Sequence, residues 1–366
     1  MQLSNRSFLA LFACTFAFMA VAITALNYGI DPEGFVRNSN DNVFERRMAQ
    51  GLAVHKAVVI EKPFNEDSFK YYLATESAPA DIVVIGSSRG YQISSEFLGK
   101  PLMNYSVGAA GLRDLLALSD LSQRKGDSRV LVMEVDPWVF NRNHPKAMSP
   151  LLYASYARGL RSVGGQPRMM EYIRYLKTRY AVLIDFNETG KSIGNLYRKL
   201  FKHDADNGFH FQEDFTPNEH LVSRDDGSFI YDRAIRDASP SYVAALAARF
   251  NERIREDNYF EKGFVFSEEY FDTFVAYVRQ LAAHRKVVLV LAPVHPLVYD
   301  AIARRTHNFF LGEERLKQAS FPASVFLIGS YSAQAVGCGP DEFFDHLHPR
   351  ASCLAKIFAT LSPAAL

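Results

Sequence analysis

Residues 81–90 read DIVVIGSSRG. Residues 82–85 are an unbroken run of Ile and Val, which is typical of a strand buried on both faces of a parallel sheet. Gly86 allows a sharp turn after this strand, so Ser87 and Ser88 stand at its carboxyl end, where ligands bind in open α/β sheets. The stretch predicts one of two structures: an ordinary strand-to-helix turn capped by a serine, or an exposed turn that presents Ser88 as a nucleophile.

A second motif lies near the C-terminus, where residues 341–349 read DEFFDHLHP. A neutral serine is a poor nucleophile, and it needs a base within hydrogen-bond reach and a third group that orients the base. Asp345 and His348, spaced D-x-x-H, would supply both from one loop, with His346 as the alternative base. The plain alternative is that His348 is a surface residue that precedes the last helix.

Strands and helices alternate on both sides of these motifs. We expect strands at residues 81–88, 102–107, 130–135, 287–291 and 324–328, and helices at 91–98, 112–123, 268–284, 296–305 and 350–361. This alternation predicts an α/β domain with a right-handed parallel sheet. Residues 141–264 interrupt the pattern, and we expect a largely helical insertion there, with a helix at 169–179, that packs beside the sheet and shapes the substrate site.

The N-terminal region contains an uncharged apolar run at residues 8–26. A helix of ~20 such residues is long enough to cross a bilayer. Arg6 precedes the run and Asp31 follows it, so the bulk of the chain should face outward. We therefore expect residues 1–27 to be a cytoplasmic stub and a retained single-pass anchor in the inner membrane; a cleaved signal peptide is the alternative. Residues 28–79 would be a linker and packing segment, and residues 80–366 a periplasmic or extracellular α/β domain.

Charge and cysteine usage narrow the function classes. The formal net charge is +1, which argues against a nucleic-acid surface. The ten His and three Cys show no metal-binding spacing, so we predict no metal and no other cofactor. Cys338 and Cys353 flank the D-x-x-H motif, and an oxidising compartment would permit a disulfide between them. The alternative is two buried free thiols.

Together these motifs resemble the SGNH/GDSL hydrolase superfamily. In that family a serine follows the first strand in a G-D-S block, and D-x-x-H stands near the C-terminus. Gly86-Ser87-Ser88 matches the first block with Ser87 in place of the aspartate. The G-S-S variant behind an N-terminal anchor is most similar to the extracytoplasmic branch that includes proteins of D-alanyl-teichoic acid transfer and of alginate O-acetylation. The resemblance covers roughly residues 28–366, and it implies a three-layer α/β/α fold.

The resemblance also implies roles for individual residues. Ser88, His348 and Asp345 would be the catalytic triad. The N–H groups of Ser88 and Gly108 would form the oxyanion hole, with Ala109 as the alternative to Gly108. The family's third block carries an asparagine, whereas residues 134–138 here read EVDPW and place Asp136 near that position. Three residues near strand ends are candidate substrate contacts: Arg89, Asp136 and His295.

The function that follows is a serine-dependent ester hydrolase or O-acyltransferase acting on a cell-envelope or exported glycan. The departure at Asp136 keeps a second hypothesis open. In that hypothesis the chain is a catalytically degenerate SGNH-like subunit that binds a glycan or a partner, such as a membrane-bound acyltransferase, within an acylation system.

Overall fold

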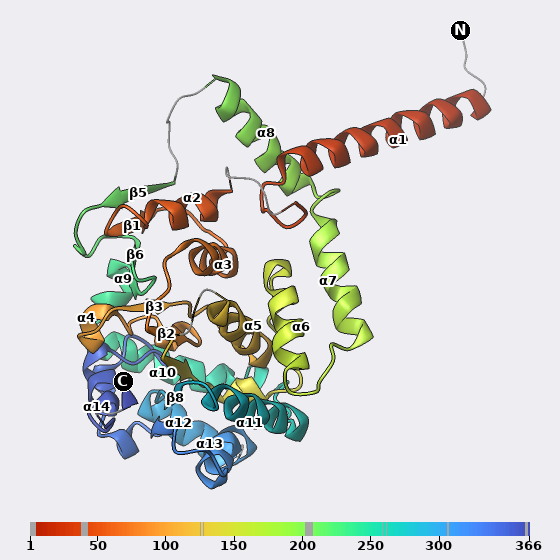
Figure 1. The fold of residues 1–366 in the computed structure, drawn as a ribbon. Coiled ribbons are helices and arrows are strands. Elements are labelled where there is room, and N and C mark those ends of the chain that lie inside the picture. Colours follow the sequence, from red (N-terminus) through yellow and green to blue (C-terminus); the bar gives the residue numbers. More distant parts are fainter. Residues whose placement is uncertain are drawn as a thin grey trace.

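A computed structural model describes residues 5–366 except 38–42, 125, 127, 202–207, 258, 261, 306, 363 and 364. The first four residues of the expected cytoplasmic stub therefore lie outside the described part of the chain. The helices, labelled in Figure 1, are α1 (Asn5–Ile30), α2 (Phe44–Gly51), α3 (Glu66–Glu76), α4 (Ser95–Leu98), α5 (Leu112–Gln123), α6 (Tyr153–Arg161), α7 (Met169–Ala181), α8 (Phe186–Phe201), α9 (Arg233–Arg236), α10 (Pro240–Arg253), α11 (Glu268–Ala282), α12 (Pro296–Arg305), α13 (His307–Gln318) and α14 (Ala351–Phe358).

A parallel five-stranded sheet forms the centre of the domain, which confirms the predicted α/β class. Its strands lie in the order β3 (Leu102–Asn104), β2 (Ile82–Ile85), β4 (Val130–Glu134), β8 (Lys286–Leu291) and β9 (Val325–Gly329). Each neighbouring pair in this order is parallel. The carboxyl ends of β2 and β3 are therefore adjacent, and both lie on the edge of the sheet where the Ser88 turn begins.

The two faces of this sheet bury alternate residues of each strand. In β2, Val83 and Ile85 pack into the larger apolar cluster with α5 and α11. Ile82 and Val84 face the other way, into a second cluster with α14. Because side chains alternate across a strand, an unbroken apolar run is buried only when helices cover both faces. The domain thus has three layers, with the sheet in the middle.

The predicted helix at residues 91–98 is shorter than expected. Ser88–Gly90 forms a 3-10 turn, and α4 begins only at Ser95. The Ser94 hydroxyl caps α4 by accepting the Phe97 N–H, and Gly99 ends it in the left-handed conformation, with φ of +63°. Caps at both ends confine the helix to one turn.

A second sheet, antiparallel and four-stranded, was not predicted from the sequence. Its order is β5 (Phe209–Gln212), β1 (Ala57–Ile60), β6 (Leu221–Arg224) and β7 (Phe229–Ile230). Strand β1 comes from the segment expected to be a linker, and the other three come from the insertion. The linker segment is therefore part of the folded body, and the insertion contains strands as well as helices.

Helix α1 projects away from the body (Figure 1). Its apolar window has a mean hydropathy of 2.3 and is not buried against the rest of the chain. This helix is long and apolar enough to cross a membrane. A signal sequence near the N-terminus would have the same length and composition.

Candidate active site

Ser88 begins the 3-10 turn that follows β2, and its side chain is half-buried. Gly86 lets the start of this turn pass close to β4, because a Cβ at this position would lie 2.5 Å from the Cβ of Glu134. Ser87 caps the turn with its hydroxyl, which accepts the Arg89 N–H at 3.2 Å. The two serines therefore have different tasks: Ser87 holds the turn, and Ser88 faces outward from it.

The loop that carries Asp345 and His348 is organised by the aspartate itself. Oδ1 of Asp345 accepts the backbone N–H groups of Leu347 at 2.7 Å and of His348 at 2.9 Å. The Phe344 N–H donates to the carbonyl oxygen of His348 at 2.9 Å and closes the turn. This leaves Oδ2 of Asp345 to meet Nδ1 of His348 at 2.7 Å. The spacing of three residues thus lets one carboxylate fix both the loop backbone and the imidazole.

Two further links hold this loop beside the serine turn. Cys338 and Cys353 form a disulfide with Cα atoms 5.4 Å apart, which confirms that prediction. The Gln92 side chain, just past the serine turn, donates to the carbonyl oxygen of Pro349 at 2.8 Å. The loop is therefore fixed to α14 by a covalent bond and to the serine turn by a hydrogen bond.

Ser88, His348 and Asp345 form a continuous hydrogen-bonded series. The Ser88 Oγ lies 2.8 Å from Nε2 of His348. Because an ionised carboxylate accepts only, Nδ1 of His348 must carry the proton that faces Asp345, which leaves Nε2 to accept the Ser88 hydroxyl. Burial alone would raise the pKa of Asp345, but the neighbouring His348 and the hydrogen bonds hold it below its usual range. The arrangement is that of a nucleophile, a base and an orienting carboxylate.

Tyr231, from the insertion, contacts this series and was not predicted. Its hydroxyl donates to the carbonyl oxygen of Ser88 at 2.9 Å. Its ring lies 5.9 Å from the imidazole of His348 and 5.1 Å from the ring of Phe344. Tyr231 is buried, and burial raises the pKa of its hydroxyl well above the usual value. It remains a neutral donor that packs one wall of the site, and no local sequence pattern marked it.

Glu134, at the end of β4, lies beneath the serine turn. Its Oε2 accepts the Ser87 N–H at 2.9 Å. Burial raises the pKa of Glu134 well above its usual value, and the charge of Asp136 raises it further. Arg89 and the Ser87 N–H oppose this effect without cancelling it. Its position, a charged residue ending an otherwise apolar strand, is the signal that would have identified it in the sequence.

Arg89 and Asp136 are not the substrate contacts that we expected. Both side chains are fully buried, and Nη1 of Arg89 pairs with Oδ1 of Asp136. Nη2 of Arg89 also donates to the carbonyl oxygen of Ala292. A buried carboxylate requires a partner charge, and a buried guanidinium requires acceptors. The pair therefore meets part of its own needs within the core, although Nε of Arg89 and Oδ2 of Asp136 have no hydrogen-bond partner among the described residues.

The candidate substrate contact at His295 is also wrong, because the residue is only 1% exposed. Its ring atom Nδ1 accepts the Leu297 N–H at 3.3 Å, and its backbone N–H donates to the carbonyl oxygen of His346 at 3.2 Å. His346 is not the base: its ring stacks on Phe250, with centroids 4.2 Å apart. Both histidines support the D-x-x-H loop, and His348 is the one that reaches Ser88.

The two expected oxyanion donors differ in whether their N–H group already has a hydrogen-bond acceptor. Within the described part of the chain, the Ser88 N–H has no acceptor. The Gly108 N–H lies on the adjacent strand end, since the Val107 N–H donates to the carbonyl oxygen of Gly86 at 3.0 Å. However, Gly108 donates to Oε2 of Glu66 at 2.9 Å. One expected donor is open, and a carboxylate of α3 occupies the other.

The Glu66 carboxylate, on a partly exposed side chain, lies beside buried polar side chains behind Gly108. The Tyr91 hydroxyl donates to the same Oε2 atom that accepts the Gly108 N–H. Lys70, one helical turn after Glu66, is fully buried and donates to the carbonyl oxygens of Asn104, at 3.1 Å, and of Gly227. Burial lowers the pKa of Lys70 to about 7 against the opposing effect of the Glu66 charge. Neither residue was predicted, because both lie in the segment taken for a linker.

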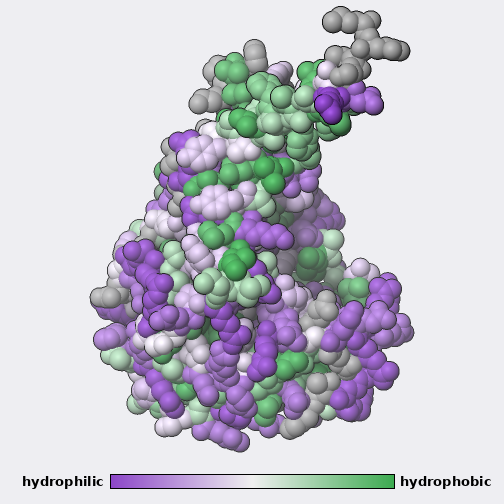
Figure 2. All heavy atoms as spheres, turned by 90° about the vertical axis from the view of Figure 1, so that its right-hand side faces the viewer, coloured by the Kyte–Doolittle hydropathy of each residue, from purple (hydrophilic) through white to green (hydrophobic). Residues whose placement is uncertain are grey.

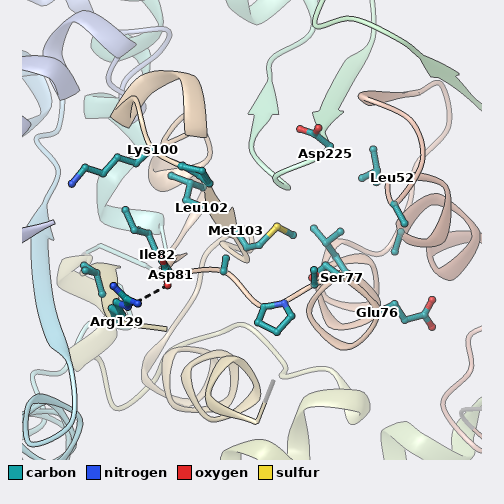
Figure 3. A pocket seen from close by; sticks show the side chains of 18 of the residues that line it. Leu52, Glu76, Ser77, Asp81, Ile82, Lys100, Leu102, Met103, Arg129 and Asp225 are labelled. Atoms are coloured by element: carbon teal, nitrogen blue, oxygen red, sulfur yellow. Dashed lines mark ion pairs between the residues drawn. The ribbon is translucent and has the colours of Figure 1, made fainter. Parts of the chain in front are cut away.

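One cavity lies away from these residues, at the opposite edge of the sheet. It measures about 860 Å³, and its lining includes Asp81, Ile82, Leu102 and Arg129, at the amino ends of β2, β3 and β4 (Figure 3). A smaller cavity of about 400 Å³ is lined by Tyr231 and Phe344, which pack beside the triad. Neither cavity is lined by Ser88, Asp345 or His348, and the smaller one adjoins the triad only through Tyr231 and Phe344.

Among the residues that the structure describes, no group of three or more His, Cys, Asp or Glu side chains is placed to hold a metal ion. The candidate site rests on the Ser88, His348 and Asp345 geometry. In comparisons with known proteins, no protein-family model matches the chain, and no curated protein sequence is significantly similar to it.

Proposed function

We propose that the chain is a serine-dependent ester hydrolase or O-acyltransferase of the SGNH type. It would be anchored in the inner membrane by α1 and act outside the cytoplasm on an acylated cell-envelope or exported glycan. The observation that carries the proposal is the series in which Ser88 Oγ lies 2.8 Å from His348 and His348 lies 2.7 Å from Asp345. The anchor is supported by the length and apolarity of α1, and its orientation by Arg6 on one side and Asp31 and Glu33 on the other.

In this mechanism Ser88 Oγ attacks the carbonyl carbon of an acyl ester while Nε2 of His348 takes the hydroxyl proton. The Ser88 N–H stabilises the developing oxyanion. His348 then returns the proton to the leaving alcohol, and an acyl-serine remains. Water or a sugar hydroxyl, deprotonated by His348, attacks this acyl group; as the bond to Oγ of Ser88 breaks, His348 returns the proton to Oγ and the free serine is restored. Water as the acceptor gives hydrolysis, and a sugar hydroxyl gives transfer.

The second candidate function is a non-catalytic subunit that binds a glycan or a membrane-bound acyltransferase. One observation favours it: the Gly108 N–H donates to the Glu66 carboxylate, so one of the two expected oxyanion donors already has an acceptor. Losing one oxyanion donor costs roughly 10²–10³ in rate. A protein that retained this fold for binding alone would tolerate that loss.

A fluorophosphonate probe applied to the full-length protein in detergent separates the two functions. The enzyme should be labelled covalently, and Ser88→Ala should abolish labelling. Ser87→Ala is the matched control, because its hydroxyl faces the Arg89 N–H and not His348, and this variant should still be labelled. An unlabelled wild-type protein with an intact thermal transition would contradict the enzymatic proposal. For a labelled enzyme, release of acetate from an acetylated sugar with and without an added acceptor glycan distinguishes hydrolysis from transfer.

A further inference from the structure

The end of α1 is joined to the insertion by a buried polar contact. Asn27 is 1% exposed, and its Nδ2 donates to the carbonyl oxygens of Val182 and Leu183, each at 3.2 Å, and to Oγ1 of Thr189 at 3.0 Å. Its Oδ1 accepts the Ser192 hydroxyl at 2.9 Å. Because these partners lie in the α7–α8 connection and the first turns of α8, the contact fixes α1 relative to both helices.

Both of these helices expose an apolar stripe. In α8, four residues at spacings of seven, four and three lie on one face, and each is at least half exposed: Phe186, Ile193, Tyr197 and Leu200. In and just after α7 a second stripe comprises Met169, Ile173, Tyr180 and Ile184, which are 46–72% exposed. No residue of α7 is fully buried. Monomeric soluble proteins rarely leave large contiguous apolar patches in water, so two exposed stripes indicate a surface that is covered in the native setting.

The stripes lie on the side of the molecule from which α1 projects. Figure 1 shows α7 and α8 running across the base of α1, to either side of it. Figure 2 looks at this side, where hydrophobic side chains gather around α1 and α8 and recur below them, at the height of α7. If α1 spans a bilayer, the surface of that bilayer passes through the base of α1, and both helices lie against it.

The composition of the two helices matches this location. Tyrosines are abundant there, with Tyr172, Tyr180 and Tyr197 each 45–52% exposed. Arg174 and Lys177 are exposed in α7. Tyrosine is enriched at the boundary between lipid and water, and basic side chains are attracted to anionic headgroups.

We propose that α7 and α8 lie in the outer interfacial layer of the membrane, with their two apolar stripes in contact with lipid. This inference rests on the proposal that α1 spans the membrane. Lipid is favoured over a protein partner because a spanning α1 places both stripes at the bilayer surface without any further component. The consequence for the site is geometric. Helices α1, α7 and α8, joined by the Asn27 contact, would hold the catalytic domain at a fixed height and tilt above the membrane.

The test measures the depth of single fluorescent labels in the full-length protein. In a Cys14→Ala background the remaining cysteines are in the disulfide, so a thiol-reactive nitrobenzoxadiazole label reports one introduced site. Labels at Ile173→Cys and Ile193→Cys report the stripes. Phe16→Cys reports α1, and Ala303→Cys, exposed on α12, is the control for water. Each protein is reconstituted into phosphatidylcholine–phosphatidylglycerol vesicles that carry a doxyl quencher either near the headgroup or near the end of the acyl chain.

We expect the labels at 173 and 193 to be quenched more by the shallow quencher, because interfacial helices lie about 5–10 Å into the headgroup boundary. The label at 16 should be quenched more by the deep one, and the label at 303 by neither. Quenching at 16 with none at 173 and 193 overturns the inference while the anchor stands. No quenching at 16 overturns the anchor and the inference with it. The labels at 173 and 193 could face water in these vesicles but be shielded from water in native membrane vesicles. That result would overturn the inference, because a protein partner and not lipid would then cover the stripes.

Discussion

The Oγ atom of Ser88 lies 2.8 Å from Nε2 of His348, although 260 positions separate the two residues in the chain. The contact exists because the serine turn and the D-x-x-H loop both stand at the carboxyl edge of one parallel sheet. The loop adds its own constraint, since Asp345 binds two backbone N–H groups with one oxygen and the imidazole with the other. A base oriented in this way is ready to accept a proton without reorganisation.

The first prediction concerns the orienting carboxylate. Asp345→Asn keeps the size of the side chain, but its amide can donate to Nδ1 of His348 and so favour the tautomer with the proton on Nε2. We expect kcat for ester cleavage to fall roughly 10⁴-fold, as in other triads, with a much smaller change in KM. Steady-state kinetics on an acetylated sugar would measure both constants. A variant that retained wild-type kcat would show that Asp345 has no part in the reaction.

The second prediction concerns the occupied oxyanion donor. In Glu66→Ala the Gly108 N–H would be free to meet an oxyanion, and we expect kcat/KM on a small ester to rise toward the 10²–10³-fold that one donor is worth. Gly108→Ala is the informative companion, since its Cβ would lie 2.8 Å from Oε2 of Glu66 and 3.3 Å from the Tyr91 hydroxyl, and the Glu66 contact would have to shift. A folded Glu66→Ala protein with unchanged or lower activity would mean that Glu66 supports the site instead of filling it.

The third prediction concerns the disulfide. Replacing Cys338 and Cys353 by Ala opens a loop of 15 residues, and the chain-entropy model assigns ~3 kcal/mol to its closure. We expect lower thermal stability and lower activity, because the loop carries both Asp345 and His348. Differential scanning calorimetry and ester cleavage measure the two effects, and Cys14→Ala should change neither. Two free thiols in exported protein, detected by mass analysis without reductant, would contradict the bond itself.

The fourth prediction concerns pH and Lys70. Its pKa is lowered from 10.5 to about 7 in the folded state, so between these values the unfolded chain binds more protons than the folded one. Stability should therefore rise with pH in this window, by ~1.4 kcal/mol per unit from this group, and the full penalty of burying the charge remains below pH 7. Denaturant unfolding at several pH values should show this slope in the wild type and its loss in Lys70→Met. The exposed Lys100→Met should retain it, and parallel curves for wild type and Lys70→Met would contradict the shift.

The fifth prediction concerns orientation. With Arg6 on the cytoplasmic side, protease added to intact spheroplasts should digest the α/β domain and leave an N-terminal tag protected. Immunoblots against tags at both ends would follow the two fragments. Protection of the whole chain until the membrane is lysed would place the domain in the cytoplasm, where the disulfide would also be unexpected.

The sequence by itself determined the parallel α/β core, helix α5 and helix α12, because local hydrophobic patterning and turn residues encode these elements directly. It also singled out Ser88, Asp345 and His348, since each motif combines a specific chemistry with a strand end or a short spacing. For Cys338 and Cys353 it left a disulfide and two free thiols open, and the tertiary structure decided for the disulfide. The tertiary structure decided what surrounds them. Arg89 and Asp136 pair in the core, Glu66 binds the Gly108 N–H, and Tyr231 packs on His348, because burial and long-range contacts set the partner of a polar side chain. Strand β1 and its three partners also depend on pairing between distant segments, and no periodicity within a single segment specifies such pairing.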